Sequence, residues 1–122
     1  MINVEALQKA IVAHSGWKAR LITAVSSGRF DVTTDTVKAD DQCAFGKWLY
    51  SSELTAAEKA TEHYRTVKEF HARFHQEAAK VVELATSGQK RKAEEAMVLG
   101  SAYNKASHAL TEAMVKWRES LR

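Results

Sequence analysis

The chain has 122 residues, a formal net charge of +3, no proline and a single cysteine. This length is sufficient for one domain with its own core, and one cysteine excludes an internal disulfide and is typical of a reducing, cytoplasmic compartment. The mild charge, the lack of an apolar run of about 18–20 residues and the lack of a signal-peptide pattern argue against nucleic-acid binding, a membrane span and secretion. We therefore expect one domain over residues 1–122.

The first predicted element is an amphipathic helix from Val4 to Val25. Its apolar positions follow a helical spacing and are Val4, Leu7, Ile11, Leu21 and Val25. His14 occupies the same stripe, and a histidine buried in a helix seam must make a hydrogen bond or bind a metal. Gly28 is a plausible C-terminal stop for this helix.

The segment from Arg29 to Ala39 is rich in β-branched and polar residues and predicts an extended connection. Asp40 or Asp41 then resembles an N-cap that opens a short helix through about Tyr50. This places Cys43 in the first turn, where the helix dipole favours a thiolate and lowers the pKa of the thiol. A helix this short must dock on other elements to be stable.

Two long helices complete the pattern. Thr55 and Glu58 predict a capping box at the start of the third helix, which ends near Gly88. Its stripe consists of Ala57, Ala60, Tyr64, Val67, His71, Phe74, Ala78, Val81 and Ala85, with His75 at the edge. The last helix is predicted from about Gln89 to Leu121, with Ala93, Met97, Gly100, Tyr103, Leu110, Met114, Trp117 and Leu121 turned inward.

These elements predict an all-α fold, an antiparallel four-helix bundle whose short helix at about 40–50 carries the cysteine. The long helices have more apolar positions than one small bundle can cover, including Trp17, Tyr103, Met114 and Trp117. We therefore expect a symmetric homodimer.

His71 and His75 are four residues apart on one helix, so both imidazoles can bind the same ion. Ala72 stands where a zinc peptidase needs a glutamate, so this pair does not indicate a hydrolase. With His14 and the Cys43 thiolate the set has three nitrogen ligands and one sulfur ligand, which suits tetrahedral Zn²⁺ best. Four protein ligands leave no place for a water, so we predict a structural or sensing site, not an enzyme.

Three other features remain open. His63 is interpreted as a surface histidine, and the basic cluster Lys90–Lys92 as a solvated helix end. His108 and Glu112 form a pair that would suit a di-iron bundle of the hemerythrin or ferritin type. Besides a zinc site and a di-iron bundle, the third possibility is a purely structural dimerisation bundle whose histidines bind no metal.

The segments His14-x-x-Trp17, Cys43-Ala44-Phe45-Gly46-Lys47-Trp48-Leu49 and His71-x-x-Phe74-His75 resemble the chemoreceptor zinc-binding (CZB) domain family. The resemblance extends from about Val4 to Leu121. It implies that His14, Cys43, His71 and His75 are the zinc ligands. It also implies a homodimeric helical bundle that regulates bacterial chemoreceptors (chemotaxis) or diguanylate cyclases, in cis or in trans, in response to zinc or to oxidants. The chain contains neither a receptor signalling hairpin nor a cyclase domain, so it is either a free-standing member or an excised piece.

Oxidation of Cys43 is one switch that the residues suggest, and the alternative is that Cys43 is a buried structural ligand that no oxidant reaches. A zinc-bound thiolate is the form that oxidants attack, and oxidation weakens its bond to the metal. The short helix would then be free to shift against the bundle.

Overall fold

The computed structural model describes residues 3–121, which form helices and connections but no strand. The helices are α1 (Val4–Ser15), α2 (Trp17–Ser27), α3 (Thr34–Lys38), α4 (Ala44–Leu49), α5 (Ala56–Lys59), α6 (Glu62–Thr86), α7 (Lys90–Ala96) and α8 (Ala102–Ser120). The predicted all-α class is therefore confirmed.

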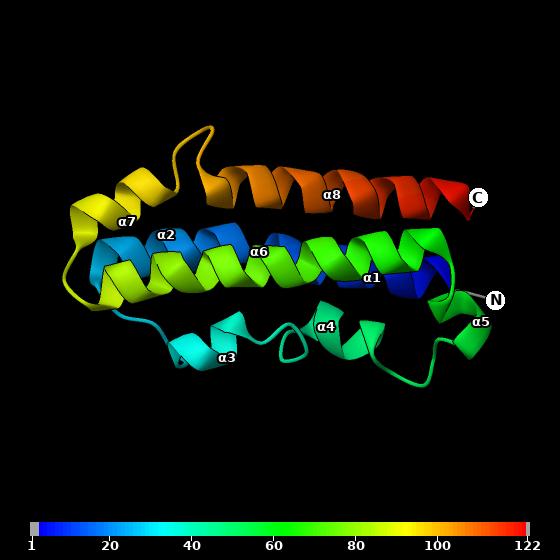
Figure 1. Cartoon of the computed structure of the whole chain (residues 1–122). Coiled ribbons are helices and arrows are strands. Elements are labelled where there is room, and N and C mark those ends of the chain that lie inside the picture. Colours follow the sequence, from blue (N-terminus) through cyan, green and yellow to red (C-terminus); the bar gives the residue numbers. More distant parts are fainter. Residues whose placement is uncertain (1–2, 122) are drawn as a thin grey trace.

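The long helix α6 is the central element, because it contacts α2, α3, α5, α7 and α8. In Figure 1, α1 and α2 follow one another along one side of α6, α3 and α4 lie along a second side, and α8 lies along a third. The segment α1–α2 runs in the same direction as α6, whereas α3–α4 and α8 run in the opposite direction. Contacts of α1 with both α4 and α8 connect the outer segments to one another.

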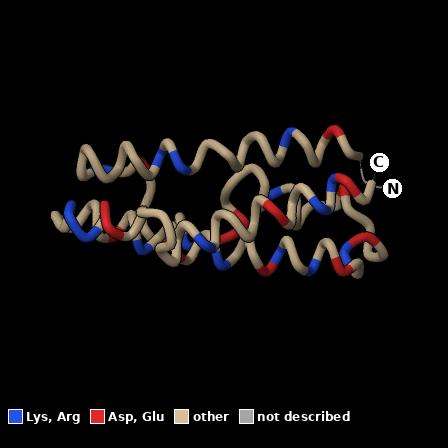
Figure 2. Tube along the Cα trace, turned by 90° about the horizontal axis from the view of Figure 1, so that it is seen from above, with Lys and Arg blue, Asp and Glu red and all other residues tan. Residues whose placement is uncertain are grey.

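The first and last helices meet at one end of the molecule. The first turn of α1 and the last turn of α8 lie at the same end in both views (Figures 1 and 2). There the Arg118 guanidinium donates a hydrogen bond of 2.7 Å to the Gln8 side-chain oxygen. Both ends of the described chain therefore leave the bundle on the same side.

Two predicted long helices are interrupted. The first one breaks at Gly16, which separates α1 from α2 and has a right-handed helical conformation. The last one breaks at residues 97–101, where Gly100 has a φ of +87° and is exposed, not turned inward as predicted. The apolar spacing continues through both breaks, which is why the sequence pattern did not reveal them. Gly28, at a φ of +72°, ends α2 as expected, and its N–H donates to the Ala24 carbonyl.

The connection before the cysteine also differs from the prediction. It contains the short helix α3, whose N-cap Thr33 accepts a hydrogen bond from the Thr36 N–H. Helix α4 starts at Ala44, so Cys43 is itself the N-cap, and neither Asp40 nor Asp41 is. The predicted capping box of Thr55 is present, but it opens the single turn α5, and the Thr61 hydroxyl caps α6.

The core is continuous and belongs to one chain. Phe45, Leu49 and Val67 have no exposed surface. Four side chains that led us to expect a homodimer are also at most 6% exposed, and these are Trp17, Tyr103, Met114 and Trp117. That reason for a dimer is therefore wrong, because other parts of the same chain already bury these side chains.

The surface carries both signs of charge. Figure 2 shows Lys and Arg interspersed with Asp and Glu along the helices. Several of these charges form pairs within one helix, including Lys116 with Glu112 and Arg91 with Glu95. None of the helices between residues 3 and 121 is long and apolar enough to cross a membrane.

Candidate metal centre

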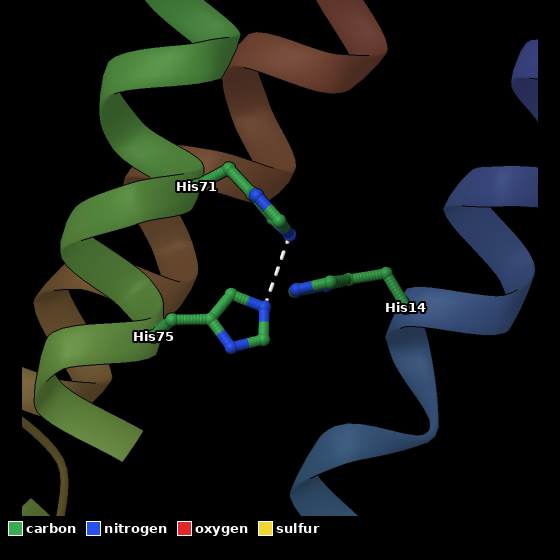
Figure 3. A group of neighbouring side chains, drawn as sticks. All are labelled: His14, His71 and His75. Atoms are coloured by element: carbon green, nitrogen blue, oxygen red, sulfur yellow. Dashed lines mark hydrogen bonds between the residues drawn. The ribbon is translucent and has the colours of Figure 1, made fainter. Parts of the chain in front are cut away.

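Three histidines from two segments meet in the core. His71 and His75 lie one turn apart on α6, and His14 lies in the last turn of α1. All three are buried, at 0%, 1% and 6% exposure respectively. Each offers one ring nitrogen, and these nitrogens lie within 4.8 Å of one another. Figure 3 shows the three rings pointing toward a common centre.

Cys43 completes the cluster from a third segment. Its Sγ lies 3.3 Å from Nε2 of His71 and 3.4 Å from Nε2 of His75. As N-cap of α4, the same sulfur accepts a hydrogen bond of 3.3 Å from the Gly46 N–H. The structure thus brings together all four residues that the sequence suggested as zinc ligands.

The position of Cys43 depends on a close backbone contact at Gly46. The loop before the cysteine folds back over the first turn of α4, and a Cβ on Gly46 would lie 1.8 Å from the Asp40 carbonyl oxygen. Only glycine leaves room for this approach, which a side chain would block. The glycine in the Cys-Ala-Phe-Gly segment is therefore required by the loop that presents the sulfur.

A backbone carbonyl orients His75. Nδ1 of His75 and the Val37 carbonyl oxygen are 2.8 Å apart. Because a carbonyl can only accept, Nδ1 carries the proton and the lone pair is on Nε2, which faces the cluster. Helix α3, which the sequence did not predict, supplies this carbonyl. A main-chain acceptor has no residue-type signature, so no sequence pattern could have identified it.

Aromatic rings surround the cluster and restrict the access of water. The Phe74 and Phe45 rings contact His14 edge-on, with centroids 4.6 and 5.9 Å away. The Trp17 ring contacts His75 at 5.1 Å. This apolar environment strengthens electrostatic interactions inside the site.

Burial keeps the histidines neutral. It lowers the pKa of His14 to about 3 and that of His71 to about 2, and the repulsion that each would feel from a protonated His75 is the second cause. The pKa of His75 is also lowered by burial, although the hydrogen bond to Val37 opposes this shift. Neutral imidazole is the form that binds metals.

The pKa of the Cys43 thiol shifts in the direction opposite to our expectation. Burial raises it, and this effect outweighs the backbone N–H groups at the start of α4, which lower it. The predicted lowering by the helix N-terminus is therefore wrong as a net effect. A metal that binds here must displace the thiol proton, after which the metal itself stabilises the thiolate.

The ligand atoms of Cys43, His71 and His75 have spacings close to those around a tetrahedral zinc ion. Bonds of about 2.0–2.1 Å to nitrogen and about 2.3 Å to sulfur place neighbouring ligand atoms about 3.3–3.6 Å apart. The Nε2 atoms of His71 and His75 are 3.0 Å apart, and the two sulfur–nitrogen distances are close to the same range. Nε2 of His14 is buried with no hydrogen-bond partner in the described chain, which a bound metal would supply.

The residues of the rival di-iron hypothesis lie outside the buried cluster. His108 and Glu112 are both exposed, and so is His63, which was predicted to be a surface histidine. The Glu112 carboxylate forms an ion pair of 3.1 Å with Lys116. The histidine cluster therefore has no carboxylate from this pair, which removes the main support for a di-iron bundle.

Comparison with known families agrees with this geometry. Residues 14–82 match the family model described as the chemoreceptor zinc-binding domain. The match covers 69 of the 122 residues, more than half of the chain, and includes all four residues of the cluster. No curated protein and no solved structure gave a significant match.

Proposed function

This chain belongs to the chemoreceptor zinc-binding domain family, and we propose that His14, Cys43, His71 and His75 hold one Zn²⁺ ion as the regulatory centre of a bacterial signalling domain. The family is one of zinc-binding, regulatory domains. The observation that carries the ligand set is the convergence of three neutral, buried imidazoles and one thiol from α1, α6 and the N-cap of α4.

The donor set favours a regulatory role over hydrolysis. Zinc hydrolases keep a coordination position for water, whereas here four protein atoms are available. When bound, the ion supplies a cross-link between three segments that are distant in the sequence. Helix α4 has only six residues and cannot be stable alone, so this cross-link affects the loop before it most strongly.

Cobalt substitution tests the ligand set. We expect wild-type protein loaded with Co²⁺ to show a thiolate-to-metal charge-transfer band, which Cys43→Ala abolishes. His63→Ala is the matched control, because His63 is an exposed histidine on the same helix as His71. A full band in Cys43→Ala, or well under one zinc per chain in protein never exposed to chelator, would contradict the proposal.

We further propose that oxidation of Cys43 is one signal. The side chain is partly exposed, so a small oxidant such as hydrogen peroxide can reach it. The thiolate sulfur attacks one peroxide oxygen, the O–O bond breaks, and a sulfenate and water result after proton transfer. The sulfenate is a poorer zinc ligand, which loosens the loop before α4.

The structure limits how far this loosening extends. Phe45 and Leu49 are fully buried, and the Tyr64 hydroxyl donates a hydrogen bond of 2.8 Å to the Leu49 carbonyl. We therefore expect oxidation to increase proteolysis at residues 39–43 but not at the end of α4. If Cys43→Ala and wild-type protein respond alike to oxidant, the switch does not lie at this cysteine.

The assembly and the partners complete the proposal. Family membership supports a homodimer and a chemoreceptor or diguanylate cyclase module as the output, and Val12 and Ile22 remain exposed on α1 and α2.

The chain directions in Figure 1 support an antiparallel four-helix bundle whose second segment is α3–α4, formed by the single domain of residues 1–122. A reducing, cytoplasmic location is consistent with a thiolate ligand. Light scattering that gives a monomeric mass at micromolar concentration would exclude the dimer.

A further inference from the structure

The metal centre borders the solvent at Cys43. The three histidines are at most 6% exposed and lie behind aromatic rings, whereas Cys43 is partly exposed. The route from the solvent to the four proposed ligands therefore runs past Cys43 and the loop before it, residues 40–42. What holds this loop in place determines how easily a metal ion passes.

The loop of residues 40–42 has few bonds to the rest of the bundle. None of its three residues takes part in a main-chain hydrogen bond with another described residue. The Gln42 side-chain amide donates to the Asp41 carboxylate at 3.2 Å, a bond within the loop itself. The Asp40 carbonyl packs closely over Gly46 but accepts no hydrogen bond from it, because the Gly46 N–H donates to the Cys43 sulfur. Segments with so few bonds open locally while the remainder of a protein stays folded.

One side-chain hydrogen bond joins the loop to helix α4. The Tyr50 hydroxyl donates it to a carboxylate oxygen of Asp40. A charged acceptor makes such a bond stronger than one between neutral groups. Tyr50 is the C-cap of α4 and Cys43 is its N-cap, so the bond closes the loop along the length of the helix. Tyr50 is 39% exposed, so the bond can break without unfolding the core.

The Tyr50 end of this bond is fixed to the bundle. Phe45 and Leu49 of α4 have no exposed surface, and the Leu49 carbonyl accepts a hydrogen bond of 2.8 Å from the Tyr64 hydroxyl on α6. The ammonium of Lys68, also on α6, lies 5.4 Å from the centre of the Tyr50 ring, within the range of a cation–π interaction. When the bond to Asp40 breaks, the loop is therefore the part that moves and α4 is the part that stays.

We propose that the hydrogen bond between Tyr50 and Asp40 is a latch that sets how fast a metal ion enters and leaves the centre. With the bond formed, residues 40–42 cover the approach to Cys43, and with the bond broken the loop can swing away from it. Neither partner is one of the proposed ligands, so the latch opposes entry and release to the same extent and leaves the affinity unchanged. Tyr50 is thus a positioning residue for the loop. This inference rests on the ligand set proposed above.

The experiment measures the rates and the affinity of Co²⁺ binding to the whole protein. Stopped-flow mixing of Co²⁺ with metal-free protein gives the association rate from the cobalt–thiolate band, and mixing of cobalt-loaded protein with excess EDTA gives the release rate. Competition with a chelator gives the dissociation constant. We expect Tyr50→Phe to accelerate both rates about 10-fold or more and to change the dissociation constant by less than about threefold, because one charge-assisted hydrogen bond is lost from both closed states.

Two further variants test whether the two residues form one latch. Asp40→Ala breaks the same bond from the other end, so the double variant with Tyr50→Phe should be no faster than the faster single variant. Asp41→Ala is the matched control, because it removes a neighbouring carboxylate that bonds to Gln42 and not to α4. It should leave both rates within about twofold of the wild type. Circular dichroism verifies folding, and Asp40→Ala carries the test if Tyr50→Phe does not fold.

Several results would overturn the inference. Unchanged rates in Tyr50→Phe would mean that this bond does not limit exchange. Faster release without faster association would mean that Tyr50 stabilises the bound metal and does not control its passage. An additive double variant, or equal acceleration in Asp41→Ala, would mean that the two residues do not act as one latch. The proposed function fails in a different way, because a wrong ligand set gives wild-type protein without a thiolate band when loaded with Co²⁺.

Discussion

Replacing Gly46 with alanine should disrupt the metal centre without touching a ligand. The new Cβ would lie 1.8 Å from the Asp40 carbonyl oxygen, where ordinary contacts begin at 3.4 Å. The loop must therefore move by about 1.6 Å, and Asp40 is only three residues from Cys43. Metal–ligand distances tolerate only about ±0.2 Å, so even a small part of this movement takes the sulfur out of bonding range.

The expected size of the effect follows from this geometry. Overpacking should destabilise the metal-free protein by about 1–3 kcal/mol. Zinc affinity should fall by about 100-fold or more, because one ligand of four is misplaced. Competition with a chelator gives the affinity, and urea unfolding in the presence of EDTA gives the stability.

Gly16→Ala is the matched control. Gly16 is two residues from His14, has a helical φ of −71°, and a Cβ there would be 3.6 Å from its nearest neighbour, the Ala13 carbonyl oxygen. This substitution should leave zinc affinity unchanged and can add about 0.4–1 kcal/mol of stability. If folded Gly46→Ala binds zinc as the wild type does and shows the full cobalt–thiolate band, the contact with Asp40 does not position Cys43.

Three further predictions concern the same core. His71→Ala should lower zinc affinity at least about 100-fold, whereas the exposed His63→Ala should leave it unchanged in the same titration; equal losses would refute the ligand set. Tyr64→Phe should cost about 1–3 kcal/mol in urea unfolding, because the buried Leu49 carbonyl loses its partner, and an unchanged midpoint would contradict this. Metal-free protein should lose stability as the pH falls below about 6.5, because the unfolded chain binds protons that the buried His14 and His71 rings do not. Each of the two histidines should contribute a loss of up to about 1.4 kcal/mol per pH unit. A thermal midpoint that does not change from about pH 6.5 to about 4.5 would contradict this prediction.

Much of the fold could be predicted because helical periodicity survives in the sequence. The spacing of Leu7, Leu21, Val67 and Trp117 reflects the faces that they bury. The same spacing concealed the breaks at Gly16 and before α8, since the apolar face continues in register on both sides. Helix α3 escaped prediction because five residues are too few to establish a period.

The sequence could predict which four residues gather at the candidate site, but not what surrounds them. His71 and His75 have a spacing that points to one ion, and the lone cysteine has a distinctive local sequence. The supporting groups are a carbonyl at Val37 and a contact at Gly46, both made by the main chain. A glycine inside a helical pattern is the one signal that could have revealed the second, since it often marks a close backbone approach. The pKa of Cys43 was misjudged because the helix dipole is visible in the sequence and the extent of burial is not.

The meeting of α1 and α8 at one end of the bundle determines how this domain can be joined to another protein. Gln8 and Arg118 tie together the two helices through which the chain enters and leaves. Residues 3–121 could therefore be inserted into a surface loop of a host enzyme without forcing the two sides of that loop apart. His14 is ten residues along α1 from Val4, the first residue of the helix, which corresponds to about 15 Å of helix. In such a fusion, the first helix would connect the metal centre to the host enzyme over a fixed length. The effect of zinc on the host could then be varied by adding or removing single turns of this helix.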